Sequence, residues 1–212
     1  QTCALPILAD AAHAQAAAST GAVAARLKIR LAEQRAALRA RYLAAPSAAS
    51  LLREHGRLVD EILQSAWDAL ALPPGTALAA VGGYGRGQLF PYSDIDLLIL
   101  LAQPADAALA RGLEEFVSLA WDIGLDIGHS VRTVDECIAL AAQDVTVQTS
   151  LLEARLIAGE RRLFRRFERE FARALDAAQF TNAKRLEQEQ RHARYRDTNL
   201  EPNIKETDRK ST

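Results

Sequence analysis

Two aspartates one residue apart follow a glycine-rich turn in the middle of this 212-residue chain. From residue 81 the chain reads VGGYGRGQLFPYSDIDLLIL, so Asp94 and Asp96 stand at the start of a strongly apolar segment. Side chains at positions i and i+2 of a strand point to the same face, so the two carboxylates should share one location. Like charges that close repel each other, and a cation such as Mg²⁺ relieves the repulsion. The spacing therefore predicts a magnesium site at Asp94 and Asp96.

The glycines before these acids suit a phosphate ligand. Gly82 and Gly83 lack Cβ atoms, so their peptide N–H groups can approach phosphate oxygens closely. Arg86 can add a charge-assisted hydrogen bond. The turn lacks the Lys-Ser/Thr ending of a P-loop, and its glycines miss the GxGxxG spacing of a dinucleotide fold. We therefore expect a triphosphate between the glycines and the carboxylates.

A third carboxylate is needed if a second metal ion is to activate an acceptor hydroxyl for in-line attack on the α-phosphorus. Asp126 is the best candidate, because it lies between two apolar residues in a segment that alternates like a strand. Asp122 is the competitor, but it belongs to the end of a helical pattern. The three acids Asp94, Asp96 and Asp126 are thus the predicted catalytic and metal-binding residues.

Each of these residues also has a plainer interpretation. An Asp-x-Asp pair beside an apolar strand is often a turn with solvated acids, and the glycine pair and Asp126 are what favour metal chemistry here. Arg86 is as well explained by a surface arginine, and Ser93 by a cap on the turn into the strand. His129 is better explained as a structural histidine than as a base, and Cys137 as a buried thiol.

Composition narrows the class of partner. The 26 Lys and Arg residues against 27 Asp and Glu give a formal net charge of -1. Because no large positive field results, nucleic acid is not an expected partner. Cys3 and Cys137 have no metal-binding or disulfide spacing, which fits a reducing cytoplasm. No run reaches the ~20 apolar residues that span a bilayer, so we expect a cytoplasmic protein without a membrane partner.

The chain contains no methionine. A natural chain normally begins with one, so we expect a fragment with altered ends, in which residues 1–7 and 207–212 are not native. Apolar periodicity predicts helices on both sides of a short βαβ-like region. The expected helices are 21–45, a second one from the N-cap Ser47 to Pro73, 104–122, one with a capping box from Thr133 to Glu136, and 145–196 with a break at Gly159. The expected strands are 77–81, 95–101 and 125–131.

Taken together, these residues resemble a known superfamily. A glycine pair, ten intervening residues, Asp-x-Asp and a later apolar-Asp-apolar strand are the pattern of the polymerase-β-like nucleotidyltransferases. More narrowly, GGYGRGQLFPYSDIDLLIL, GLDIGHSVRT, TSLLEARLIAG and NLEPNIKE resemble the N-terminal part of the bacterial bifunctional uridylyltransferase/uridylyl-removing enzymes of nitrogen regulation. The similarity covers about Leu51 to Glu206.

The resemblance implies an α+β fold: a small mixed-sheet polymerase-β-like nucleotidyltransferase domain flanked by N-terminal and C-terminal helical regions. The expected division is a helical region at 8–71, the nucleotidyltransferase domain at 72–143 and a second helical region at 144–206. Asp94, Asp96 and Asp126 would bind Mg²⁺, and Gly82 and Gly83 the nucleotide. The resemblance supports a nucleotide-binding role less strongly for Arg86 and Ser93.

The resemblance also implies a reaction, the transfer of UMP from UTP to a tyrosine hydroxyl of the PII signalling protein. The hydrolytic HD domain and the glutamine-sensing ACT domains of the family would follow residue 206, so this fragment is expected to lack uridylyl removal and glutamine sensing. Two alternatives stay open, an adenylyltransferase with another acceptor and a non-catalytic nucleotide-sensing module. No residue is visibly dedicated to uracil, so the base preference rests on the resemblance alone.

Overall fold

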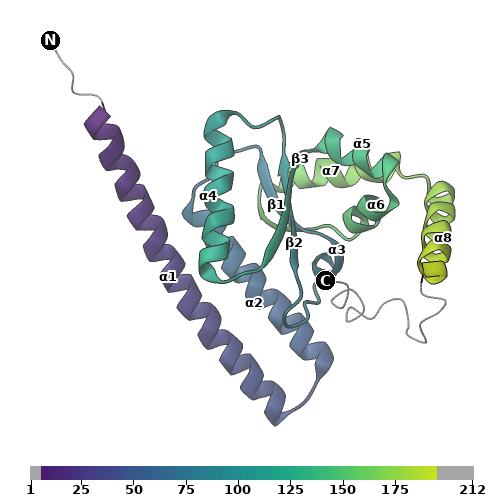
Figure 1. The fold of residues 1–212 in the computed structure, drawn as a ribbon, viewed down its shortest axis with the longest axis horizontal. Coiled ribbons are helices and arrows are strands. Elements are labelled where there is room, and N and C mark those ends of the chain that lie inside the picture. Colours follow the sequence, from purple (N-terminus) through teal and green to yellow (C-terminus); the bar gives the residue numbers. More distant parts are fainter. Residues whose placement is uncertain (1–5, 195–212) are drawn as a thin grey trace.

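A computed structural model of the chain describes the backbone of residues 6–194 and the side chains of residues 20–190. The predictions for Cys3, for the non-native ends and for the NLEPNIKE segment fall outside the described side chains. The element order is mixed throughout, with helices before, between and after the strands (Figure 1). The predicted α+β class is confirmed.

Two long helices form the N-terminal hairpin. Helix α1 (Pro6–Ala44) starts well before the expected residue 21, and helix α2 (Ala48–Ala69) follows after Pro46. Ser47 caps α2 as predicted, because its side chain accepts a hydrogen bond from the amide of Ser50. Leu27 and Leu31 of α1 are buried, and they belong to one core with residues of α2 and of the sheet. The hairpin therefore packs on the sheet domain (Figure 1).

The sheet has four strands in the order β3-β2-β1-β4. They are β1 (Thr76–Ala80), β2 (Ile95–Leu101), β3 (Ile127–Thr133) and β4 (Arg155–Gly159). Strand β1 is antiparallel to both β2 and β4, whereas β2 and β3 are parallel. The parallel pair needs a crossover, which α4 (Ala107–Ile123) supplies between them. The sheet is mixed, as the sequence predicted.

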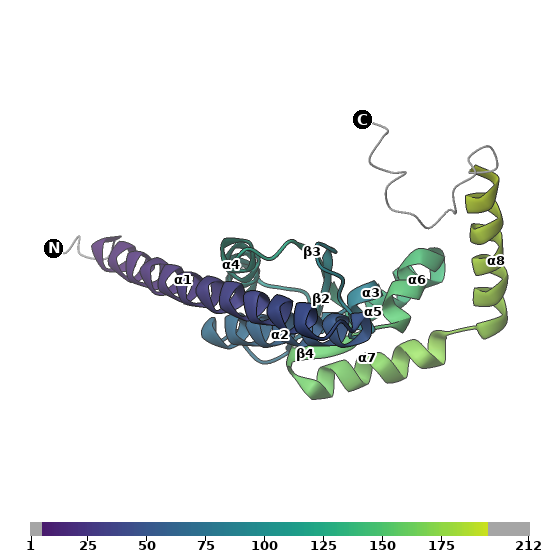
Figure 2. The same cartoon turned by 90° about the horizontal axis from the view of Figure 1, so that it is seen from below.

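Each face of the sheet contributes to a separate core. Leu97 and Ile99 of β2 pack with α1, α2 and α4, where Phe116 meets Trp67 edge to face. Leu98 and Leu100 alternate with them and pack on the opposite face against helices α5 and α7 (Figure 2). The helices after β3 are α5 (Val134–Gln143), α6 (Val145–Leu152), α7 (Arg161–Ala174) and α8 (Ala177–Arg194).

One element was predicted wrongly. Residues 145–196 were expected to be helical with a break at Gly159, but 155–159 form strand β4, which pairs with β1. Gly159 does end an element, with φ of +83°, and a Cβ there would lie 2.5 Å from the Thr76 carbonyl oxygen. A five-residue segment with three apolar residues, RLIAG, has no decisive periodicity, so only the pairing with β1 reveals the strand. The division into 8–71, 72–143 and 144–206 stays a prediction.

Smaller local predictions can also be compared with the structure. The loop expected after β1 contains a four-residue helix, α3 (Gly82–Gly85). The capping box of Thr133 and Glu136 is confirmed, with both reciprocal hydrogen bonds present. The apolar stripe of Phe164, Phe167 and Phe171 on α7 is buried. Within the described part of the chain, no helix is both long and apolar enough to cross a bilayer.

Candidate active site

Asp96 lies in β2 on the sheet face that also carries Leu98 and Leu100, with glycines on two sides of its carboxylate. A Cβ atom at Gly128 would lie 3.1 Å from Oδ1, and one at Gly82 would lie 3.4 Å from Oδ2. Gly128 is its register partner on β3, and Gly82 opens α3 with φ of +56°. Side chains at these two positions would crowd the carboxylate, so the glycines keep space around it open.

Asp94 and Asp126 lie at the ends of the neighbouring parallel strands. Ile95 pairs with Ile127, and the amide of Ile95 donates to the carbonyl of Asp126 at 3.0 Å. One residue earlier on each strand stand Asp94 and Asp126, both exposed. Both acids lie just before the strands, which begin at Ile95 and Ile127. The three predicted acids therefore come from adjacent backbone positions.

The carboxylates of these three acids do not form a cluster in the structure. Among the described residues, no three His, Cys, Asp or Glu side chains form a group that could hold a metal ion. The donor chemistry nevertheless fits a hard divalent cation, since all three acids offer carboxylate oxygens and the glycines leave room beside Asp96. Asp94 and Asp126 are exposed and can change rotamer at little cost. The assignment of a metal site to these three acids stays a prediction, with which their side-chain chemistry agrees.

A cleft of about 390 Å³ lies over Asp96. Strand β3 and helix α6 form its walls, and seven polar or glycine positions line it: Asp96, Gly128, His129, Ser130, Arg132, Thr146 and Ser150. The hydroxyl of Ser150 comes close to Gly82, since a Cβ on that glycine would lie 3.5 Å from Oγ. Sequence analysis did not select Thr146 or Ser150. Ser150 lies in the quoted segment TSLLEARLIAG, which was the available signal.

Arg86 does not reach the cleft in this structure. Its guanidinium donates to the carboxylate of Glu153 at 2.9 Å, and 61% of its side chain is exposed. An ion pair of this exposure is weak, so it would cost little to exchange Glu153 for a phosphate. The predicted phosphate contact of Arg86 stays untested, and the ion pair agrees with the surface interpretation.

Ser93 belongs to a different cavity. Its amide donates to the carbonyl of Phe90 at 3.1 Å, which closes a turn just before β2. Together with Asp126 it lines a cavity of about 650 Å³ on the side of the α1–α2 hairpin. The predicted site residues are therefore divided between two hollows, with Asp96 in the cleft beside α6 and Ser93 and Asp126 in the cavity beside the hairpin.

A polar network of Asp60, Tyr84 and Arg155 connects α3 to α2 and β4. Asp60 of α2 accepts two hydrogen bonds from Arg155 of β4, at 2.7 and 3.0 Å, and one from the Tyr84 hydroxyl at 2.5 Å. Arg155 also donates to the carbonyl of Gly85 and lies over the Tyr84 ring. Burial raises the pKa of Tyr84, and the nearby charge of Asp60 raises it further, so the phenol stays neutral.

The same region leaves no room for a side chain at Gly85. A Cβ there would lie 2.0 Å from the carbonyl oxygen of Glu153. Gly83 has open surroundings, because the nearest atom to its Cβ position is 3.6 Å away on Arg86. Gly85 is therefore required by packing, while packing does not explain Gly83.

Cys137 behaves as the plainer interpretation predicts, whereas His129 is exposed and its role stays a prediction. Cys137 is buried, and desolvation raises the pKa of its thiol to about 11, which leaves it unreactive. His129 contacts the ring of Trp121 edge to face, with ring centroids 6.3 Å apart. His129 also lines the cleft over Asp96, whereas Cys137 does not.

Known proteins match this chain in sequence. A family model described as "Nucleotidyltransferase domain" matches residues 57–157. A "Bifunctional uridylyltransferase/uridylyl-removing enzyme" of Burkholderia orbicola is 51% identical over 92% of this chain and 23% of its own length. One of the same name from Nitrosospira multiformis is 56% identical over 82% of this chain and 20% of its own length. The chain thus spans about a fifth of the length of these relatives.

A solved toxin–antitoxin structure with AMP-PNP has a TM-score of 0.32 and 19% identity, covering 65% of this chain and 98% of that chain. That similarity is too low to carry weight. The sequence matches are much stronger, and the matched range contains the glycine turn and all three acids. Residues 57–157 of this chain therefore match a nucleotidyltransferase domain, and the chain is similar in sequence to the bifunctional uridylyltransferase/uridylyl-removing enzymes.

Proposed function

We propose that this chain transfers UMP from UTP to a tyrosine hydroxyl of the PII nitrogen-regulatory protein. The observation that carries the proposal is the position of Asp96, whose carboxylate stands between Gly82 and Gly128 in a polar cleft, with Asp94 and Asp126 at the adjoining strand ends. The names of the relatives support uridylyl transfer. The tyrosine acceptor, PII and Mg²⁺ come from the family resemblance.

Each residue has a role in this proposal. Gly82 and Gly83 let the backbone approach the triphosphate, and Arg132 and Ser150 line the cleft where its oxygens would lie. Asp94, Asp96 and Asp126 would hold Mg²⁺. When bound there, the cation would neutralise phosphate charge and lower the pKa of the acceptor hydroxyl. The acids would also orient the hydroxyl oxygen for in-line attack.

The bond changes are simple. The acceptor oxygen forms a bond to the α-phosphorus as its proton leaves, and the bond from that phosphorus to the pyrophosphate oxygen breaks. Positioning and charge stabilisation suffice for such a step, so no Ser or Cys nucleophile on the enzyme is required.

Transfer of label from each nucleoside triphosphate tests the proposal. The protein is incubated with Mg²⁺, PII protein and one α-³²P-labelled triphosphate at a time. We expect label on PII from UTP alone, and none on a PII variant whose acceptor tyrosine is replaced by phenylalanine. Label from ATP instead would identify an adenylyltransferase. Triphosphate binding without any transfer would support a nucleotide-sensing module.

A further inference from the structure

The cavity beside the hairpin is the larger of the two hollows at the predicted acids. It measures about 650 Å³, against about 390 Å³ for the cleft over Asp96. Helix α1, the start of α2 and the loop before β2 enclose it, and Leu38, Leu89 and Ile95 give it apolar walls. Tyr42, Tyr92 and His55 add rings. Such a lining suits a partly apolar, aromatic ligand group.

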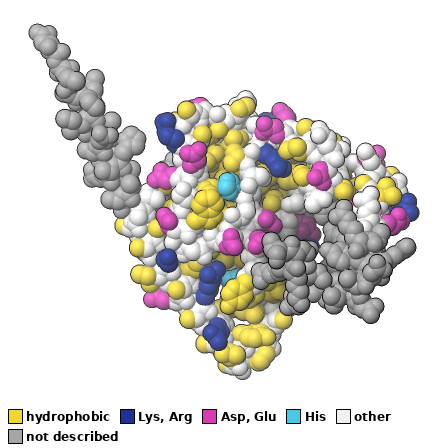
Figure 3. All heavy atoms as spheres, in the orientation of Figure 1, with side chains coloured by type: hydrophobic (Ala, Val, Ile, Leu, Met, Phe, Trp, Pro, Cys, Tyr) yellow, Lys and Arg dark blue, Asp and Glu magenta, His cyan; other side chains and the backbone are white. Residues whose placement is uncertain are grey.

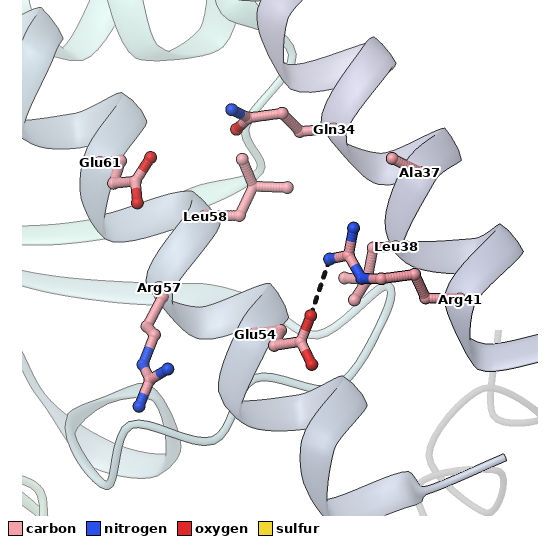
Figure 4. A pocket seen from close by; sticks show the side chains of 8 residues that line it. All are labelled: Gln34, Ala37, Leu38, Arg41, Glu54, Arg57, Leu58 and Glu61. Carbon is pink, nitrogen blue, oxygen red and sulfur yellow. Dashed lines mark hydrogen bonds and ion pairs between the residues drawn. The ribbon is translucent and has the colours of Figure 1, made fainter. Parts of the chain in front are cut away.

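Two arginines on this wall form no ion pair with an acidic residue in the part of the chain that the structure describes. Other arginines of α1 pair with glutamates of α2: Arg30 with Glu61, and Arg41 with Glu54 across the adjacent groove of about 280 Å³ (Figure 4). Arg35 and Arg39 line the cavity, and neither forms an ion pair with any described carboxylate.

Other groups at the cavity add little charge to this surface. Partial burial lowers the pKa of Arg35, although the residue is exposed. His55 adds no charge near neutral pH, because burial lowers its pKa. Asp126 is the one acidic side chain among the described residues that line this cavity. A surface with two such arginines and apolar walls complements an anionic, partly apolar ligand.

The cavity also opens at the proposed reaction centre. Asp126 and Ser93 belong to its lining, whereas Asp96 lines the cleft on the α6 side. Asp126 was assigned to the acceptor hydroxyl, and the glycine turn with Asp96 to the triphosphate. Figure 3 shows the face concerned: hydrophobic side chains gather toward the lower end of the hairpin, with Lys and Arg side chains beside them. Two ligands could therefore reach the acids from two sides.

We propose that this cavity is the acceptor subsite: it takes the aromatic side chain that carries the acceptor hydroxyl, while Arg35 and Arg39 bind carboxylates on neighbouring residues of the acceptor polypeptide. The inference rests on the proposed function and adds the place and the charge of the acceptor segment. A nucleobase is the competing occupant. The triphosphate positions beside Gly82 and Asp96 lie in the other hollow, which favours the acceptor.

Charge reversal tests the subsite in the natural full-length protein. The variant Arg35→Glu/Arg39→Glu is compared with Arg26→Glu/Lys28→Glu, which makes the same charge change on exposed residues of α1 outside the cavity. KM for PII and KM for UTP are measured separately. We expect KM for PII to rise about tenfold or more in the first variant, with KM for UTP within about twofold of wild type. The control should match wild type.

A complementary measurement separates recognition from damage to the fold. PII variants in which acidic residues near the acceptor tyrosine become lysine should be poor acceptors for wild type and better acceptors for the Arg35→Glu/Arg39→Glu enzyme. If the charge-reversed enzyme fails to fold, as thermal melting would show, Arg35→Gln/Arg39→Gln replaces it in both assays. Neutral glutamines remove the attraction without adding acids to the cavity.

The outcomes divide cleanly. Transfer by wild type with an unchanged KM for PII in the cavity variant overturns this inference and leaves the proposed function standing. A raised KM for UTP alone makes the cavity the nucleotide site, which also overturns it. Absence of transfer by wild type to any PII protein removes the proposed function and the inference together.

Discussion

Asp96 differs from the other two acids in how closely its surroundings fit it. Glycines from two other elements border its carboxylate, although all three acids are exposed. Because Gly82 and Gly128 carry no side chains, neither position crowds this carboxylate. We therefore expect the side chains of Asp94 and Asp126 to change rotamer so that they share a cation with Asp96.

His55 connects the hairpin to the loop that leads into the site. Its Nδ1 lies 3.2 Å from the carbonyl of Leu89, so that nitrogen carries the proton and donates. Burial lowers the pKa of His55 below its ordinary value of about 6.5, the hydrogen bond to Leu89 opposes this, and the nearby charge of Arg35 lowers it further. The unfolded chain therefore binds more protons than the folded one as the pH falls below that value.

This shift predicts a direction for acid sensitivity. The free energy of unfolding should fall as the pH drops from about 7.5 to about 5.5, and the contribution of His55 should be complete above its unfolded pKa. In His55→Gln, which does not titrate and can still donate to Leu89, the fall should be smaller. Urea denaturation at the two pH values measures both. Equal pH dependence in the two proteins would show that His55 does not contribute.

Among the elements, helix α3 depends most on its neighbours. It has only four residues, and Asp60, Arg155 and the carbonyl of Glu153 fix it from α2 and from the β4 side. A helix this short has little stability of its own. The geometry of the glycine turn is therefore set by α2 and β4 and not by the turn sequence alone.

Two glycines of α3 give a matched pair of variants. Gly85→Ala should lower the free energy of unfolding by about 3 kcal/mol, because the new Cβ would overlap the Glu153 carbonyl. Gly83→Ala meets only ordinary contacts and should leave the melting temperature near that of wild type. If Gly83 lies against phosphate, KM for UTP should nevertheless rise in that variant. Unchanged kinetics for Gly83→Ala would remove Gly83 from the nucleotide site.

The strands show what sequence alone could predict. Strand β2 was predicted with its observed bounds, because seven nearly continuous apolar residues follow a clear turn. Strand β4 was missed because it is short and is defined by its pairing with β1, across a register shift between Leu78 and Ala79. The support that Arg155 gives to Gly85 depends on that pairing. It therefore could not be foreseen either.

At the scale of the molecule, the sheet is shared by two cores. Phe116 belongs to the core on the α2 and α4 side, and Phe167 to the core on the α5 and α7 side. Alternate residues of β1 and β2 contribute to one core or the other. Loss of packing in one core should thus weaken the whole domain, and with it the alignment of β2 and β3 that places the acids.

A truncation in one core tests this coupling. Phe116→Ala should cost about 3–5 kcal/mol of unfolding free energy, since Phe116 is fully buried against Trp67. Phe90→Ala removes a ring that is 60% exposed, and should cost under about 0.5 kcal/mol. Both variants should unfold in a single transition, measured by tryptophan fluorescence and circular dichroism. Two separate transitions would contradict the shared core.

The site itself was partly predictable. The chemistry of Asp94 and Asp96 follows from alternation on a strand, and the parallel register of β2 with β3 brings Asp126 beside them. The division of the site into two hollows was not predictable, because it depends on how α1 and α6 pack around the strand ends. Long-range packing of that kind has no short sequence signal.

The central claim is that the acids at the ends of β2 and β3 carry nucleotidyl transfer. The most direct test is the rate of UMP transfer by Asp96→Asn, with Asp122→Asn as the control, since Asp122 is an exposed acid on nearby α4. We predict that Asp96→Asn loses at least about a hundredfold in rate while its melting temperature stays near that of wild type and Asp122→Asn transfers normally. Undiminished transfer by a folded Asp96→Asn would contradict the account.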